Sequence, residues 1–128
     1  MNNICLNNQN QIELPGPNDL IINIDLSEVC RINGMGPFTQ INLLDGRNYT
    51  CAVALSFFED LLHTHTFYKV HASHLINKVH VKKIITGEED AVIMYDGAKL
   101  PISRRIKADF IAVMQDWALQ KMYNSIAV

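Results

Sequence analysis

Residues 67–84 read FYKVHASHLINKVHVKKI, and the rest of the chain can be interpreted around this stretch. It contains four lysines and three histidines but no acidic residue. A second basic segment without acids, LPISRRIK, follows at residues 100–107. In a chain of formal net charge −2, two such segments predict a concentrated surface for a polyanion.

The two halves of the chain differ in charge. Residues 1–62 hold two basic and seven acidic residues, a balance of −5. Residues 63–128 hold nine basic and six acidic residues, a balance of +3, together with all five histidines. This asymmetry favours an anionic partner for one face only.

Length and composition indicate one globular domain. The chain has 128 residues, of which 48% are hydrophobic and 19% charged, which is ordinary for a domain with a core. No apolar run approaches the roughly 20 residues of a membrane span, and no signal peptide is evident, so we expect a cytoplasmic protein. The three cysteines form no C-x-x-C pair, which predicts neither a disulfide framework nor a zinc knuckle. Cys30 and Cys51 fall in predicted strands, and we expect buried reduced thiols there.

Most of the chain is predicted to form short antiparallel strands. Asp45-Gly46 and Asp96-Gly97 each predict a hairpin with a type I′ turn, and the Gly-rich residues 33–37 predict an exposed loop. Residues 73–77 read as a turn or a single helical turn. The predicted strands are residues 11–14, 20–24, 26–32, 38–44, 47–53, 67–71, 80–86, 91–95 and 98–102.

Two helices complete the predicted fold. Ser56-x-x-Glu59 resembles a capping box for a short central helix that buries Leu55, Phe58 and Leu62. Ser103 is expected to cap a C-terminal helix, whose apolar stripe is Ile106, Phe110, Val113 and Trp117. The fold class is therefore mostly β, with elongated antiparallel sheets, a short central helix and a C-terminal helix. We expect residues 1–19 to form a tail and first strand, with about the first ten residues frayed, and residues 111–128 to form a helical extension.

The histidines offer the main route to a metal or catalytic site. The pairs His63-x-His65 and His71-x-x-His74 could chelate, but no cysteine lies close and H-E-x-x-H is absent. Ser73 has no nucleophile elbow around it, and no P-loop or dinucleotide-binding motif occurs. We therefore expect no metal, no cofactor and no catalysis.

FYKVHASHLINKVHVKKI, followed by a hairpin through YDGAKLPISRRIK, resembles the LytTR DNA-binding domain. The family pattern is approximately F-x-R-V-H-R-S-Y-L-V-N, then D-G-x-x-[LI]-P-V-S-R-R. The resemblance covers about residues 20–110. It implies a regulator that contacts double-stranded DNA through loops in successive major grooves. It also implies that two copies bind a direct repeat, as a homodimer on DNA.

Such domains commonly follow a receiver domain. Only about 20 residues precede the resemblance here, so we expect a stand-alone member or a piece of a longer protein. A regulatory protein partner is compatible with this interpretation.

The resemblance also assigns roles to individual residues. It places Arg104 at a base-reading position, where an arginine can form two hydrogen bonds with guanine. Ala72 occupies the position after V-H that is often polar in the family, and Phe38 and Thr39 lie where a third contact is expected. His74 and Asn77 are further candidate helpers, although Asn77 could equally be a structural turn residue. The expected phosphate contacts are Lys69, Lys78, Lys82, Lys83, Arg105 and Lys107.

One alternative uses the same scaffold differently. Met35, Phe38 and the apolar character around Ala72 suit a protein–protein interaction module whose DNA binding is weak or lost. Salt-dependent binding to random duplexes would distinguish the two interpretations.

Overall fold

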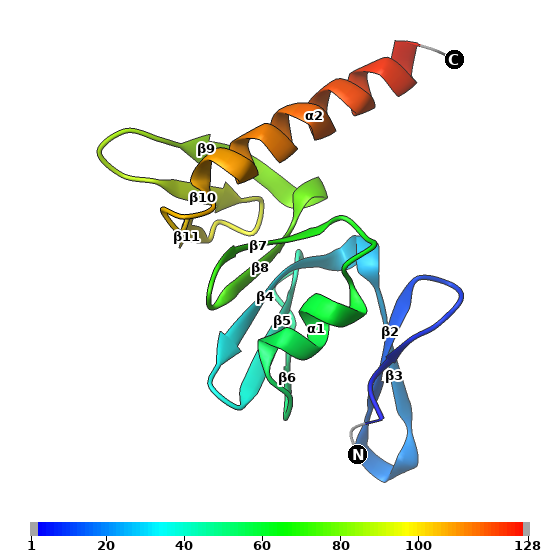
Figure 1. The fold of residues 1–128 in the computed structure, drawn as a ribbon. Helices are drawn as coiled ribbons and strands as arrows, with labels where there is room; N and C mark the ends of the chain where they lie inside the picture. The colour runs from blue at the N-terminus through cyan, green and yellow to red at the C-terminus, as the bar shows by residue number, and fades with distance from the viewer. Residues whose placement is uncertain (1–2, 127–128) are drawn as a thin grey trace.

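The computed structural model describes residues 3–126, and most of them form antiparallel strands (Figure 1). Two α-helices accompany the strands, α1 (Leu55–Leu61) and α2 (Lys107–Ile126). The strands are β1 (Cys5–Leu6), β2 (Gln11–Pro15), β3 (Ile21–Asp25), β4 (Val29–Met35), β5 (Phe38–Leu43), β6 (Asn48–Cys51), β7 (Phe67–His71), β8 (His74–Asn77), β9 (Val81–Ile85), β10 (Ala91–Met94) and β11 (Lys99–Pro101).

The strands form three antiparallel sheets. The central sheet has five strands in the order β6-β5-β4-β8-β7, and two three-stranded sheets have the orders β1-β2-β3 and β11-β10-β9. The predicted fold class, mostly antiparallel strands with a short central helix and a C-terminal helix, is confirmed.

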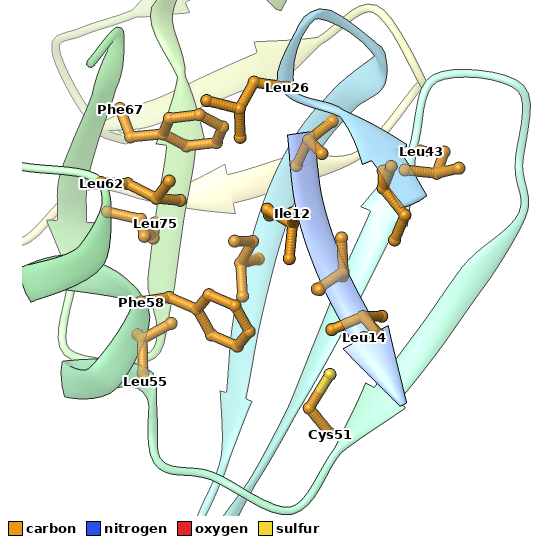
Figure 2. Close-up of a cluster of buried hydrophobic side chains, with 14 residues drawn as sticks. Ile12, Leu14, Leu26, Leu43, Cys51, Leu55, Phe58, Leu62, Phe67 and Leu75 are labelled. Carbon is orange, nitrogen blue, oxygen red and sulfur yellow. The ribbon is translucent and has the colours of Figure 1, made fainter. Parts of the chain in front are cut away.

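One hydrophobic core lies on the face of the central sheet that α1 covers. Figure 2 shows Leu55, Phe58 and Leu62 directed toward the strands, with Ile12 and Leu14 of β2 closing the other side. Phe58 and Leu62 are fully buried, as the helical stripe predicted. Burial of this stripe holds the short helix in place, since a seven-residue helix is marginal on its own.

A second core lies on the opposite face of the central sheet. Cys30, Val70 and Ile76 of the central sheet meet Val92 and Met94 of β10 and Phe110 of α2. Arg31 on β4 donates to Asp96 at 2.9 Å and ties the central strand to the β10–β11 turn. Burial raises the pKa of the Cys30 thiol to about 11, and the Asp96 carboxylate adds to this rise.

Both Asp-Gly hairpins form where predicted, but the predicted type I′ turn is wrong. Type I′ needs positive φ at both central residues, whereas Gly46 and Gly97 are positive and their aspartates are not. Gly46 N donates to Leu43 O at 3.0 Å, and Asp45 Oδ1 accepts from Arg47 N at 3.0 Å. This side-chain bond holds the aspartate in the turn and leaves the left-handed conformation to glycine alone.

Two strand assignments in the central sheet also need correction. The sequence predicts a turn or helical turn at residues 73–77, but His74–Asn77 is strand β8, paired with both β4 and β7. It predicts a loop at residues 33–37, but β4 continues through Met35. A Cβ at Gly34 would lie 3.3 Å from Leu55 Cβ, so glycine here lets α1 pack directly on the strand.

The chain ends and helix starts differ from prediction as well. Within residues 3–10, predicted to be frayed, Cys5–Leu6 pairs with β2, and Asn7 Oδ1 accepts hydrogen bonds from Gln9 N and Gln11 N. Helix α1 begins after Ala54 without a side-chain cap, so the predicted capping box does not form. Ser103 does not cap α2 directly, because a turn over residues 103–106 precedes the helix.

The apolar stripe of α2 is only partly in the core. Phe110 is fully buried, whereas Ile106, Val113 and Trp117 are half-buried. Farther along, Leu119 and Met122 are 60% and 56% exposed. Figure 1 shows the red end of α2 extending beyond the sheets.

Candidate nucleic-acid interface

Three turns lie next to one another along one edge of the molecule. They are the β4–β5 turn at residues 35–38, the β7–β8 turn at residues 71–74 and the turn at residues 103–106 that precedes α2. Gly34 N donates to Ser73 O at 2.8 Å, and Ser103 N donates to Val70 O at 2.8 Å. Figure 1 shows the three turns in succession on the left side.

The turn at residues 103–106 carries the two arginines of the second basic segment. Arg104 and Arg105 are both exposed. Within residues 3–126, neither guanidinium has an ion-pair partner. Both are therefore available to an external anion.

The first turn of α2 fixes the position of these arginines. The Tyr68 hydroxyl donates to the Asp109 carboxylate, and the Tyr68 and Phe110 rings pack with centroids 5.2 Å apart. Lys107 Nζ lies 2.9 Å from Asp90 Oδ1. Burial and the Asp109 carboxylate raise the pKa of Tyr68 to about 12, so the hydroxyl keeps the proton that it donates.

Two of the expected phosphate contacts already have carboxylate partners. Lys107 is paired with Asp90, and Lys69 Nζ lies 3.5 Å from Glu59 Oε1. Both pairs are partly exposed, and such pairs contribute little stability. Each lysine can therefore exchange its carboxylate for a phosphate at small cost.

The remaining lysines occupy other positions. Lys82 and Lys83 are exposed on β9, an edge strand of the β11-β10-β9 sheet. Lys78 lies in the 3₁₀ turn η3 (Lys78–His80), at the end of β8 away from the β7–β8 turn. The structure therefore does not bring Lys78 to the three turns.

The smaller candidate residues separate into exposed and buried groups. Ala72 and Phe38 are exposed at the tips of two of the turns, Phe38 by 47%. Thr39 is fully buried and Asn77 is 1% exposed. Asn77 Nδ2 donates to Val29 O at 2.9 Å and Asn77 Oδ1 accepts from Thr66 Oγ1 at 2.6 Å, so both groups are engaged inside the fold.

Two histidines flank the central turn. The His71 and His74 rings pack with centroids 5.4 Å apart, and His71 Nδ1 accepts a hydrogen bond from Ser73 N at 3.1 Å. Burial lowers the pKa of His74, and the neighbouring His71 and Arg31 lower it further. His74 is half-buried, so the turn presents Ala72 and Ser73 ahead of it.

Met35 is an exposed residue of this edge to which the sequence assigned no DNA contact. It is 43% exposed and pairs with Phe38 across the β4–β5 turn. Its neighbour Gly36 has a φ of +67°, and Gly36-Pro37 is the sequence signal that could have located a tight turn here.

Neither a metal cluster nor a membrane span is found in the described part of the chain. No three His, Cys, Asp or Glu residues there gather as metal ligands would. No helix in residues 3–126 has the length and apolarity needed to cross a bilayer.

Comparison with known proteins gives the family. The model of the LytTr DNA-binding domain matches residues 19–115. A solved structure, the LytTr DNA-binding domain of a Bacillus cereus protein assigned as a methyl-accepting/DNA response regulator, has a TM-score of 0.66 and 23% identity. That similarity covers 83% of this chain and 96% of the other. No curated protein matches. Since the family model spans most of the chain, this protein belongs to the LytTR family of DNA-binding domains.

Proposed function

We propose that this protein is a sequence-specific transcriptional regulator whose three adjacent turns enter the major groove of duplex DNA. The observation that carries this proposal is the alignment of the turns at residues 35–38, 71–74 and 103–106, with Arg104 and Arg105 exposed on the last. A turn projecting from an edge can enter a groove that a sheet face cannot. Family membership supports DNA binding in general.

Each turn has a different part in this proposal. Arg104 reads guanine through two hydrogen bonds, the commonest specific contact. Ala72 contacts a thymine methyl group, and Phe38 with Met35 makes a second apolar contact. Lys69, Lys82, Lys83, Arg105 and Lys107 neutralise phosphates and set the orientation of the domain on the duplex.

In this proposal the regulator acts in the bacterial cytoplasm, with two copies side by side on a direct repeat. Each copy presents one base-contacting edge and so occupies one DNA site. A second DNA site in the same orientation places a second copy beside the first, and their proximity adds affinity. A regulatory protein partner could supply the input signal.

Selection of bound sequences from a random duplex pool tests the proposal. We expect an enriched motif repeated in the same orientation, with affinity that falls steeply as salt concentration rises. A pool that shows no enrichment while total binding remains salt-dependent would indicate nonspecific binding and contradict sequence specificity.

A second candidate function is protein–protein association through the same edge. The exposed side chains of Met35 and Phe38 favour it, because they give the edge an apolar part beside Ala72. A mobility-shift assay on pooled duplexes at two salt concentrations distinguishes the candidates. A protein-binding module would show neither enrichment nor a salt slope.

A further inference from the structure

A cavity of about 610 Å³ lies at the end of β8 away from the β7–β8 turn. It is bounded by the β1–β2 loop, the residues after β3, the segment between α1 and β7, and α2. Leu26, Val79 and Trp117 give it apolar walls, and Asn10 and Thr64 give it polar ones. Its size falls in the range of small-molecule sites.

One carboxylate lines the cavity. Among the described residues that line it, Asp25 carries the only carboxylate, and none is a lysine or an arginine. Asp25 Oδ1 accepts a hydrogen bond from Gln11 Nε2 at 2.9 Å, which holds the carboxylate in place. A cation bound in this cavity would therefore have one carboxylate to pair with.

The aromatic wall of the cavity already holds cations. Lys78 Nζ lies 4.9 Å from the centroid of the Trp117 ring, and Lys121 Nζ lies 5.2 Å from it. Ammonium groups at these distances are attracted by the negative face of the indole. Both lysines have long flexible stems, so each ammonium group can leave the ring for a position in solvent.

We propose that this cavity binds a small organic ammonium ion, which takes the place of a lysine on Trp117 and faces the Asp25 carboxylate. An aromatic face combined with a carboxylate is the chemistry that recognises quaternary ammonium groups. The site is separate from the three turns, so ligand binding can be measured without DNA.

Trp117 is the only tryptophan of the chain, so its fluorescence reports directly on the cavity. The test is a fluorescence titration of the full chain with choline, with sodium chloride matching the ionic strength. The neutral isostere 3,3-dimethylbutan-1-ol is titrated in parallel. We expect a saturable change with choline and an apparent Kd about threefold or more weaker for the alcohol.

Three variants sharpen the test. Asp25→Asn should weaken choline binding about threefold and leave the alcohol unaffected, while Lys78→Ala should tighten choline binding by removing a competing cation. Glu28→Gln is the matched control, because it removes one negative charge three residues away at a residue that does not line this cavity. Circular dichroism checks that each variant is folded.

Several outcomes would overturn the proposal. A fluorescence response that does not saturate shows that choline has no site on Trp117. Equal affinity for choline and the alcohol shows that the cavity does not recognise a cation. Equal weakening by Asp25→Asn and Glu28→Gln shows that choline responds to overall charge and not to the Asp25 carboxylate.

Discussion

Arg104 and Arg105 are consecutive in one exposed turn, yet adjacent side chains leaving a turn point in different directions. Only one of them can be aimed into a groove with good geometry. The proposed function assigns the base contact to Arg104 and a phosphate contact to Arg105. This division of roles can be tested with one substitution at each position.

Replacing Arg104 with lysine should relax the base preference at one position of the operator. Lysine keeps the charge but cannot form the two parallel hydrogen bonds of the guanidinium, which contribute about 1–3 kcal/mol of discrimination. Arg105→Ala should lower the affinity without changing the preferred sequence. Selection from a random pool with each variant measures both effects. If Arg104→Lys binds with full affinity and selects an unchanged motif, Arg104 contacts only a phosphate and does not read a base.

The raised pKa of Tyr68 predicts how the stability of the protein changes at alkaline pH. Its pKa is raised from 10.0 to about 12 in the folded protein, so the protonated hydroxyl stabilises the fold below pH 10. That contribution is lost as pH rises through the interval from 10 to about 12. The denaturation midpoint of wild type should therefore fall more steeply across this interval than that of Tyr68→Phe.

Tyr123→Phe is the control for this comparison, because Tyr123 is 71% exposed. It should follow the wild-type curve. If Tyr68→Phe and wild type fall in parallel, the hydrogen bond to Asp109 does not contribute to alkaline stability.

At the scale of elements, α1 is held by burial and not by its cap. Phe58→Ala should destabilise the protein by about 3–5 kcal/mol, because it leaves a cavity between α1 and the central sheet. Ser56→Ala should change stability by no more than about 0.5 kcal/mol, since Ser56 is exposed and caps nothing. Urea denaturation of the two variants measures both values. A loss of about 1 kcal/mol for Ser56→Ala would show that Ser56 caps α1 after all.

The sequence predicted the elements that carry strong local signals. Both Asp-Gly hairpins, most strands and the buried stripe of α1 were located correctly. Strand β8 was missed because its conformation depends on its neighbours. Leu75 faces one core and Ile76 the other, and β4 and β7 pair with it on either side.

The exposure of the candidate site residues was predicted less completely than the fold. The exposure of Arg104, Arg105 and Ala72 followed from their turn positions. The burial of Thr39 and Asn77 did not, and for Asn77 it depends on segments distant in sequence. Asn77, for example, donates to Val29 O across 48 residues.

At the scale of the whole molecule, the proposed DNA contacts extend from the turns to the edge strand β9. Replacing Lys82 and Lys83 with alanine should weaken binding equally for all sequences. The dependence of affinity on salt should become shallower by roughly one unit for each phosphate that the variant no longer neutralises. Mobility-shift assays over a salt series measure the slope.

Lys99 offers the matched control on the same sheet, because it lies on β11, across the sheet from β9, and is not among the proposed phosphate contacts. Lys99→Ala should leave the salt slope unchanged. If the Lys82 and Lys83 variant also keeps the wild-type slope, that pair faces away from the duplex.

Two backbone hydrogen bonds link the three turns. They allow the spacing of the contacted bases in an operator to be set independently of which bases are preferred. Main-chain atoms set the spacing of the turns, through Gly34 N to Ser73 O and Ser103 N to Val70 O. Side chains at the tips can change without disturbing those bonds. For a protein that binds DNA as proposed, relatives that keep these main-chain bonds should keep the spacing between contacted bases. Substitutions at one turn should change the preferred bases at that turn's position alone.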